Sequence, residues 1–191
     1  MKKLLALMVL SVAVNSGFAL EVAFIDMNKI FENYYETKDA NEALNTQREI
    51  KAEEAEKMLE AYKALGEKYQ ELLQMTENPL LTKEQREAKK GELKDIETQA
   101  KQKRADLEKH RQKSFQEVRA KYEEKRDAII ARLVKFIQKV AKVKKYDLVL
   151  DISGKTANGI PGVIYYDESK DITDVILKNL NAGHENKEEK K

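Results

Sequence analysis

The chain has 191 residues, of which 36 are Lys or Arg and 34 are Asp or Glu, with 7 Gly, 2 Pro and no Cys. The lack of cysteine excludes disulfide frameworks, Cys-ligated zinc and a thiol nucleophile, and two histidines leave little material for Ser-His-Asp chemistry or a multi-His metal site. A charged fraction of 37% with so few helix breakers indicates long, solvated helices rather than a compact globule with one large core.

The first 19 residues have the pattern of a secretory signal peptide. Met1-Lys2-Lys3 is a short basic start, an apolar run extends from Leu4 to Val14, and Gly17-Phe18-Ala19 is a small-x-small cleavage site. The alternative is a membrane anchor, but this apolar run is too short to span a bilayer core of about 30 Å. We therefore expect cleavage after Ala19, which leaves 34 basic and 34 acidic residues in the mature chain.

Next comes a short apolar run, Val22-Ala23-Phe24-Ile25, which predicts a strand buried on both faces. Helical spacing then extends from about Asn28 to Met75, with a break near Thr37. Part of this helix has the alternating steps of 3 and 4 that are typical of a coiled-coil seam, the row of a and d positions where two helices pack. These seam positions are Ala55, Met58, Tyr62, Leu65, Tyr69 and Leu72.

A turn that contains Pro79 separates this helix from a second one. Thr82 and Gln85 have the spacing of a capping box, which predicts a helix from Lys83 to about Lys145. An antiparallel hairpin with its turn near Pro79 would place residue i opposite about residue 160−i, within about one helical turn. We therefore expect two long helices that pack side by side.

The seam of the second helix is less regular than that of the first. It has polar residues at Lys103, His110 and Ser114, and it then proceeds by steps of four through Val118 and Tyr122, a stutter that locally unwinds a left-handed supercoil. A strong apolar pattern resumes at Ile129, Leu133, Phe136, Val140 and Val143. The pattern predicts a loosely held arm and a well-packed base.

Beyond Lys145 the apolar period changes from that of a helix to that of strands. Tyr146–Ile152 and Val163–Tyr166 are predicted strands, joined by a glycine-rich loop. Asp171 is a predicted cap for a last amphipathic helix, and residues 182–191 form a charged tail that we expect to be disordered.

These elements predict an α+β fold, predominantly α, in which a helical hairpin of residues 37–128 with its tip at 76–82 stands on a β-rich base of residues 20–36 and 129–181. A core of 70 residues contributes only about 3–5 kcal/mol to stability, so without disulfides we expect strand pairing between copies of the chain. The residues expected in this oligomerisation base are Val22, Phe24, Ile25, Phe136, Val140, Leu148, Leu150, Val163, Ile164 and Tyr165.

The order of these features resembles the Skp/OmpH family of periplasmic chaperones. The resemblance rests on the cleaved signal, the strand before Asn28-Lys29-Ile30-Phe31, the proline-poor hairpin, and Val163-Ile164-Tyr165-Tyr166 followed by Asp171-Ile172-Thr173-Asp174. It implies a jellyfish-like homotrimer whose three arms enclose a cavity. It also implies a periplasmic, ATP-independent holdase that binds unfolded outer-membrane β-barrel proteins, with no catalytic activity and no cofactor.

The charge of this chain departs from the strongly basic character of that family. Residues 20–75 carry 7 basic and 13 acidic side chains, whereas residues 93–145 carry 17 and 8. Two interpretations stay open: pairing of charges between the two helices, or a positive field that attracts acidic clients. Contact with the membrane surface or with lipopolysaccharide also stays open, whereas nucleic acid is a poor candidate because the mature chain is neutral.

Apolar residues toward the arm tip are the candidates for client binding. They are Tyr62, Tyr69, Leu73, Met75, Leu80 and Leu81. Packing in the seam explains the two tyrosines, whereas Leu73, Leu80 and Leu81 are harder to bury in a two-helix tip. His110 is expected at a polar seam position and His184 in the tail, with no catalytic or metal role for either. The alternative function is an exported coiled-coil scaffold or spacer.

Overall fold

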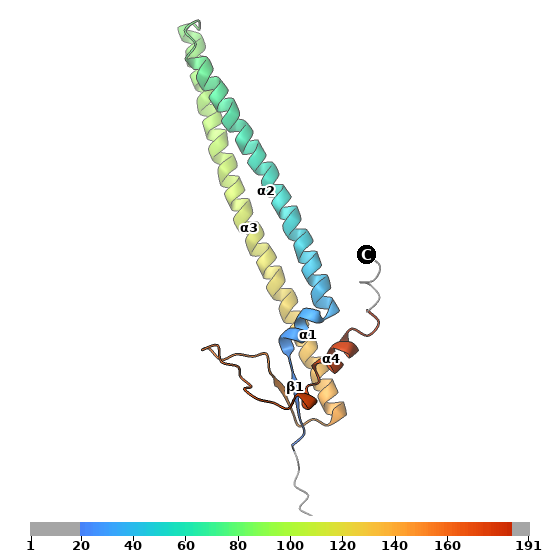
Figure 1. Ribbon diagram of the computed structural model, residues 1–191. Helices are drawn as coiled ribbons and strands as arrows, with labels where there is room; N and C mark the ends of the chain where they lie inside the picture. Colours follow the sequence, from blue (N-terminus) through green and yellow to red (C-terminus); the bar gives the residue numbers. More distant parts are fainter. Residues whose placement is uncertain (1–19, 185–191) are drawn as a thin grey trace, which may run out of the picture.

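The computed structural model describes residues 20–184, and in it a long helical hairpin extends from a small base (Figure 1). The elements in chain order are β1 (Val22–Ile25), α1 (Met27–Asn33), α2 (Tyr35–Thr76), α3 (Lys83–Lys144), β2 (Leu148–Asp151), the short 3₁₀ helix η1 (Glu168–Lys170) and α4 (Thr173–Leu180). We call the paired helices α2 and α3 the arm. The remaining elements form the base, together with the part of α3 that packs against them, from about Ile129 onward. The predicted signal peptide and residues 185–191 of the predicted tail lie outside the described residues.

Helices α2 and α3 have the predicted lengths and the predicted cap. The Thr82 hydroxyl accepts a hydrogen bond from the Gln85 backbone N–H at 3.2 Å, and the Gln85 side chain accepts one from the Thr82 N–H at 2.9 Å. At its other end α3 stops at Lys145, which has a left-handed backbone with φ of 60°. The capping box therefore fixes where the second half of the arm begins.

The facing residues of the two helices are offset by one to two turns from the predicted centre. Glu54 contacts His110, where the residue numbers add up to 164 and lie near the limit of the predicted range, whereas Gln47 contacts Lys121, where the sum of 168 lies beyond it. The first turns of α3 therefore extend beyond the end of α2. The predicted break in the first helix is also displaced, because it lies at Tyr34, where ψ is 132°, rather than near Thr37.

Asn181 stabilises the chain at this break. Its side-chain oxygen accepts a hydrogen bond from the Tyr35 N–H at 3.0 Å, and its side-chain amide donates one to the Asn33 carbonyl at 2.9 Å. A break in a helix leaves backbone groups without their usual partners. The Asn181 side chain, directly after α4, therefore forms hydrogen bonds with the backbone on both sides of the junction between α1 and α2.

The base has one hydrophobic core, built by α1, α3, α4 and β1. Its buried members are Ile25, Ile30, Tyr34, Ile129, Leu133, Ile137 and Ile176. The prediction for Ile129 and Leu133 is confirmed, but Val143 is 72% exposed. Ile137 is buried instead. The buried α3 residues of this core, Ile129, Leu133 and Ile137, are four apart and face α1 and α4, so they do not follow the steps of 3 and 4 of a coiled-coil seam.

Strands β1 and β2 pair in parallel, with Val22 opposite Leu148. The sheet differs from the prediction in two respects. Strand β1 is buried on one face rather than on both, because Ala23 and Ile25 are buried whereas Val22 and Phe24 are half-buried. The predicted strand Val163–Tyr166 is wrong, because this segment is irregular and Ile164 and Tyr165 are each 87% exposed. A strand needs a partner for its backbone groups, and within residues 20–184 this segment has none.

Candidate functional site

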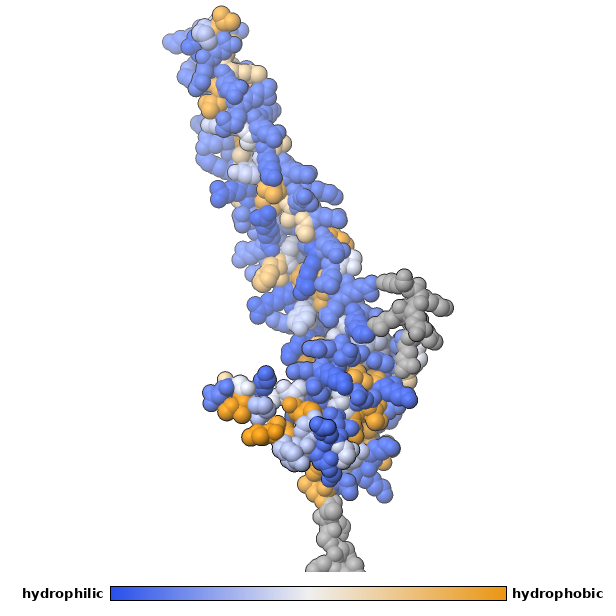
Figure 2. Space-filling view, viewed as in Figure 1, coloured by the Kyte–Doolittle hydropathy of each residue, from blue (hydrophilic) through white to orange (hydrophobic). Residues whose placement is uncertain are grey.

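The far end of the arm exposes apolar side chains (Figure 2). Leu80 is 87% exposed and Leu73 and Met75 are also exposed, whereas Leu81 is half-buried. The turn itself is ordered, because the Asn78 side chain accepts a hydrogen bond from the Leu80 N–H at 2.9 Å. Leu80 is thus held away from the helix pair, which is the placement that the sequence predicted for it.

The two candidate tyrosines of the arm have a different environment. Tyr62 and Tyr69 are half-buried between the helices and line an open groove of about 260 Å³ together with Leu65, Ile96 and Ala100. Leu72, one step further along the seam, is buried. This placement confirms the seam interpretation for these residues and separates them from the leucines of the tip.

The predicted base residues fall into two groups. Ile25 belongs to the core of the single chain, Phe136 and Val140 pack against it, and Val22, Phe24, Leu150 and Val163 are half-buried. Leu148, Ile164 and Tyr165 are exposed, together with Ile160 of the preceding loop. Ile160, Ile164 and Tyr165 belong to the segment that follows β2, and Figure 2 shows an apolar area on the loop that projects from the base. The outer edge of β2 has no strand partner within residues 20–184.

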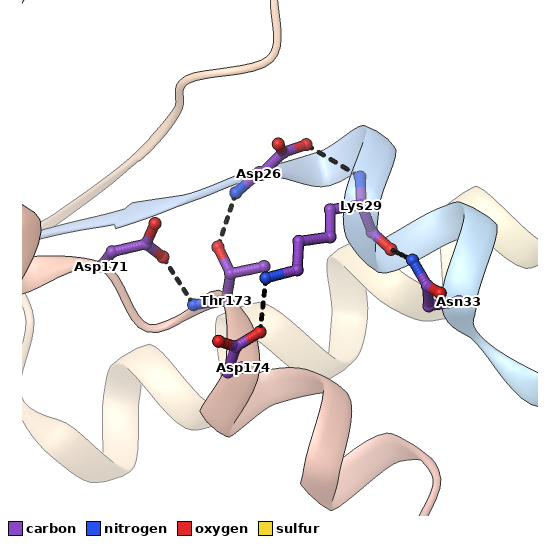
Figure 3. A network of polar contacts seen from close by, with 6 residues as sticks. All are labelled: Asp26, Lys29, Asn33, Asp171, Thr173 and Asp174. Atoms are coloured by element: carbon purple, nitrogen blue, oxygen red, sulfur yellow. Dashed lines mark hydrogen bonds and ion pairs between the residues drawn. The ribbon is translucent and has the colours of Figure 1, made fainter.

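The Asp171-Ile172-Thr173-Asp174 segment has a structural role at the base (Figure 3). The Thr173 hydroxyl accepts a hydrogen bond from the Asp26 N–H at 2.8 Å, and Asp171 accepts one from the Thr173 N–H at 2.8 Å. Lys29 forms an ion pair with Asp174 at 2.7 Å, which raises the pKa of the lysine. The predicted cap is displaced by one residue, because Ile172 is the N-cap of α4 and has no side-chain cap bond, whereas Asp171 precedes it and bonds the first N–H of the helix. The segment ties α4 to the junction of β1 and α1.

Charges on the arm pair mainly within each helix. Pairs three or four residues apart include Lys51–Glu54, Lys101–Glu97 and Arg119–Glu123. Between α2 and α3, an ion pair joins Arg132 to Glu36, and the His110 ring lies 3.5 Å from the Glu54 carboxylate. Few direct pairs therefore join the acidic residues of α2 to the basic residues of α3.

Glu36 connects the arm to the base. Its carboxylate accepts hydrogen bonds from the hydroxyls of Tyr34 at 2.7 Å and Tyr35 at 3.3 Å and pairs with Arg132. Burial works to raise its pKa, but the bond from Tyr34 and the charge of Arg132 outweigh that effect, and the net pKa is lowered. The pKa of Tyr34 is raised, first by burial and then by the bond to Glu36. These contacts favour the charged carboxylate.

The two histidines differ in how well their prediction held. His110 is half-buried in the seam, with its Nε2 atom 3.5 Å from Glu54 and 3.3 Å from the Ser114 hydroxyl, as expected for a polar seam residue. His184 was expected in the free tail, but its ring stacks on Tyr35 with centroids 3.6 Å apart. Within residues 20–184, no group of three or more His, Asp or Glu side chains could hold a metal ion. In the same part of the chain, no helix is long and apolar enough to cross a membrane.

Comparison with known proteins agrees with this architecture. A family model described as outer membrane protein (OmpH-like) matches residues 21–180, from the start of β1 to the end of α4. A search of curated proteins gave no match. The matched family consists of periplasmic chaperones that act in outer-membrane protein biogenesis and have no enzymatic activity. Because the match includes every element of the arm and the base, the chain belongs to the OmpH-like (Skp/OmpH) family of chaperones.

Proposed function

We propose that this protein is an ATP-independent periplasmic holdase, which keeps unfolded outer-membrane proteins from aggregating before they insert into the membrane. The observation that supports this most is the exposed apolar end of the arm, where Leu80 and its neighbours Leu73 and Met75 face solvent. Exposed apolar patches of soluble proteins often serve as binding surfaces for other apolar chains. Many weak contacts of this kind allow release without an energy source.

The proposed assembly is a homotrimer with its arms around a shared cavity. The support for this comes from the base, where a parallel sheet of two strands has a free outer edge on β2. Parallel sheets are normally covered on both faces, and bare edges pair readily with other chains. Ile164 and Tyr165 lie exposed on the loop that follows β2, so copies of the chain would cover them as the base assembles.

The charge of α3 supports encounter with clients. Residues 93–145 carry 17 basic and 8 acidic side chains, and few of the basic ones pair directly with α2, so the positive side chains that face solvent would attract acidic stretches of an unfolded chain. Salt screens such attraction over about 8–10 Å near physiological ionic strength. We therefore expect added salt to slow client capture.

A light-scattering assay tests the proposal. The mature chain from Leu20 is added to an outer-membrane β-barrel that is refolded from urea, and we expect scattering to be suppressed at about one trimer per client. A variant with Leu73, Leu80 and Leu81 changed to Ser should retain the client less well while sedimentation shows an unchanged oligomer. Ile50→Ser is the matched control, because Ile50 is an exposed apolar residue of α2 away from the tip.

Two results would contradict the proposal. A wild-type protein that leaves aggregation unchanged would favour the alternative of a structural spacer, which binds one folded partner. A tip variant that protects clients as well as wild type does would show that the tip leucines are not the contact surface.

A further inference from the structure

A groove of about 740 Å³ lies between α2 and α3 in the middle of the arm, away from both the tip and the base. Apolar side chains of both helices line it: Ala52, Ala55 and Leu59 from α2, and Phe115, Val118 and Tyr122 from α3. Phe115 is 67% exposed and Tyr122 is 39% exposed. Two large aromatic rings therefore border an apolar channel that is open to solvent.

The stutter in α3 explains why the groove exists. Ser114, Val118 and Tyr122 follow one another at steps of four, so the apolar positions drift around the helix relative to the seam. On the facing helix, Ala52 and Ala55 have side chains too short to fill the gap. Phe115 is left outside the seam as a result, although its ring is large enough to pack in a core.

The rim of the groove has more positive than negative charge. Arg48, Lys51, Arg111 and Arg119 border it, and Glu56 is the acidic residue among them. Lys51 and Arg119 are paired with carboxylates of their own helices. Arg48 donates to the neutral side chain of Asn45, and Arg111 has no ion pair within the described residues.

The two arginines therefore keep uncompensated charge beside exposed aromatic rings. A carboxylate that binds there meets a guanidinium, which forms strong charge-assisted hydrogen bonds with carboxylates. An adjacent apolar side chain can occupy the channel between Phe115 and Tyr122. Such a surface is complementary to an apolar segment with acidic residues at its ends.

We propose that this groove binds client segments in which apolar or aromatic residues are flanked by Asp or Glu. The inference rests on the proposed holdase function and assigns it a second contact surface, separate from the leucines of the tip. The tip then contacts apolar segments of any charge, whereas the groove selects among segments by their charge. Such a selection would place the acidic stretches of a client at mid-arm.

Fluorescence anisotropy with two labelled peptides tests the selection. Both peptides have the same apolar and aromatic residues, flanked by Asp in one and by Lys in the other. We expect the Asp peptide to bind about tenfold more tightly than the Lys peptide. Phe115→Ser should weaken binding of the Asp peptide about tenfold, because the ring can no longer bury apolar surface of the peptide, and Arg111→Glu should weaken it about tenfold, because a charged contact is lost. Ile50→Ser and Arg104→Glu are the matched controls, since both residues are exposed on the arm and neither lines the groove.

A photoreactive amino acid in place of Phe115 identifies the occupant in the full protein. We expect the mature chain with this residue to form cross-links to an unfolded β-barrel client. Cross-links only to another copy of this chain would overturn the proposal in favour of contact between arms. Binding of phosphatidylglycerol vesicles that requires Phe115, without binding of the Asp peptide, would overturn it in favour of a lipid site.

The failure of this inference can be told apart from failure of the proposed function. If wild type suppresses aggregation while Phe115→Ser binds the Asp peptide normally, the groove proposal is wrong and the holdase proposal stands. If wild type does not suppress aggregation, the holdase proposal itself fails. Loss of folding is not expected to complicate the result, because Phe115 is largely exposed, and circular dichroism of each variant checks its helix content.

Discussion

The base and the arm bury their apolar residues to different degrees. In the base, Ile30, Leu133 and Ile176 are fully buried, whereas most seam residues of the arm, such as Leu65 and Tyr69, are only half-buried. The arm also places Lys103 on its seam, where it is exposed. Stability is therefore concentrated in the base, and the arm keeps apolar surface that is accessible to other molecules.

This division suits the proposed holdase function. A tightly packed arm would leave no apolar groups for the proposed clients, and a loosely packed base would not support the proposed assembly of several arms. Two helices without a wide packed core can bend and separate at modest cost, because few contacts are lost. The contrast predicts that mutations in the base change stability, whereas mutations on the arm change binding.

The largest expected effect comes from the core of the base. Leu133→Ala removes a fully buried side chain and should lower the free energy of unfolding by about 2–5 kcal/mol. Leu65→Ala is the matched variant in the arm, and we expect about half that loss or less, because its side chain is half-buried. Urea unfolding at one fixed protein concentration measures both. Equal losses would contradict the contrast between the two regions.

The junction of the two regions gives the next effect. Asn181→Ala removes both hydrogen bonds at the break between α1 and α2, and we expect a loss of about 1–2 kcal/mol, because water can replace part of each bond. Hydrogen exchange at the Tyr35 amide should become faster than in wild type. Asn179→Ala is the control, since Asn179 bonds only the Val175 carbonyl of its own helix. Unchanged exchange at Tyr35 would show that Asn181 does not hold the junction.

Local patterns predicted the helices of the arm well. The seam from Ala55 to Leu72 and the capping box of Thr82 and Gln85 depend on residues a few positions apart, and the structure confirms both. The two strands that open and follow the hairpin, β1 and β2, were also expected. The apolar periodicity of a segment determines its local structure when its neighbours impose little on it.

Long-range contacts account for what the sequence did not reveal. Ile137 is buried because α1 and α4 pack on a side of α3 that does not face α2, and a pattern read for two paired helices does not include that side. The role of Asn181 could not be predicted from the sequence, because it depends on a break between two helices almost 150 residues earlier in the chain. The segment Val163–Tyr166 has strand-forming residues but no strand partner in the part of the chain that the structure describes. The mid-arm groove forms because the small side chains of alanines on α2 lie opposite the stutter of α3, and this depends on which residues of the two helices face each other.

A smaller effect is expected at the free end of the arm. Thr82→Ala removes the hydroxyl that caps α3 and should destabilise its first turn by about 1 kcal/mol. Hydrogen exchange at the Gln85 amide should become faster, while the midpoint of global unfolding stays close to that of wild type. Thr98→Ala is the control, because the Thr98 hydroxyl bonds the Lys94 carbonyl inside the helix. A large drop in global stability would mean that the arm and the base unfold as one unit.

The smallest effect is a pH dependence at Glu36, where the arm meets the base. The lowered pKa of this carboxylate in the folded protein means that its contacts stabilise the fold above the ordinary value of 4.5 and lose this contribution as the pH falls through the folded value. Glu36→Gln should therefore be less stable than wild type near neutral pH, by at most about 1 kcal/mol, since the pair with Arg132 is partly exposed.

The difference between Glu36→Gln and wild type should shrink as the solution is made more acidic than pH 4.5, because the wild-type carboxylate then becomes protonated and neutral like the amide. Thermal unfolding across this range measures it. Glu49→Gln is the control on the same helix, because Glu49 is exposed and has no ion pair within the described residues. A difference that stays constant with pH would show that Glu36 stabilises the junction through contacts that do not depend on its charge.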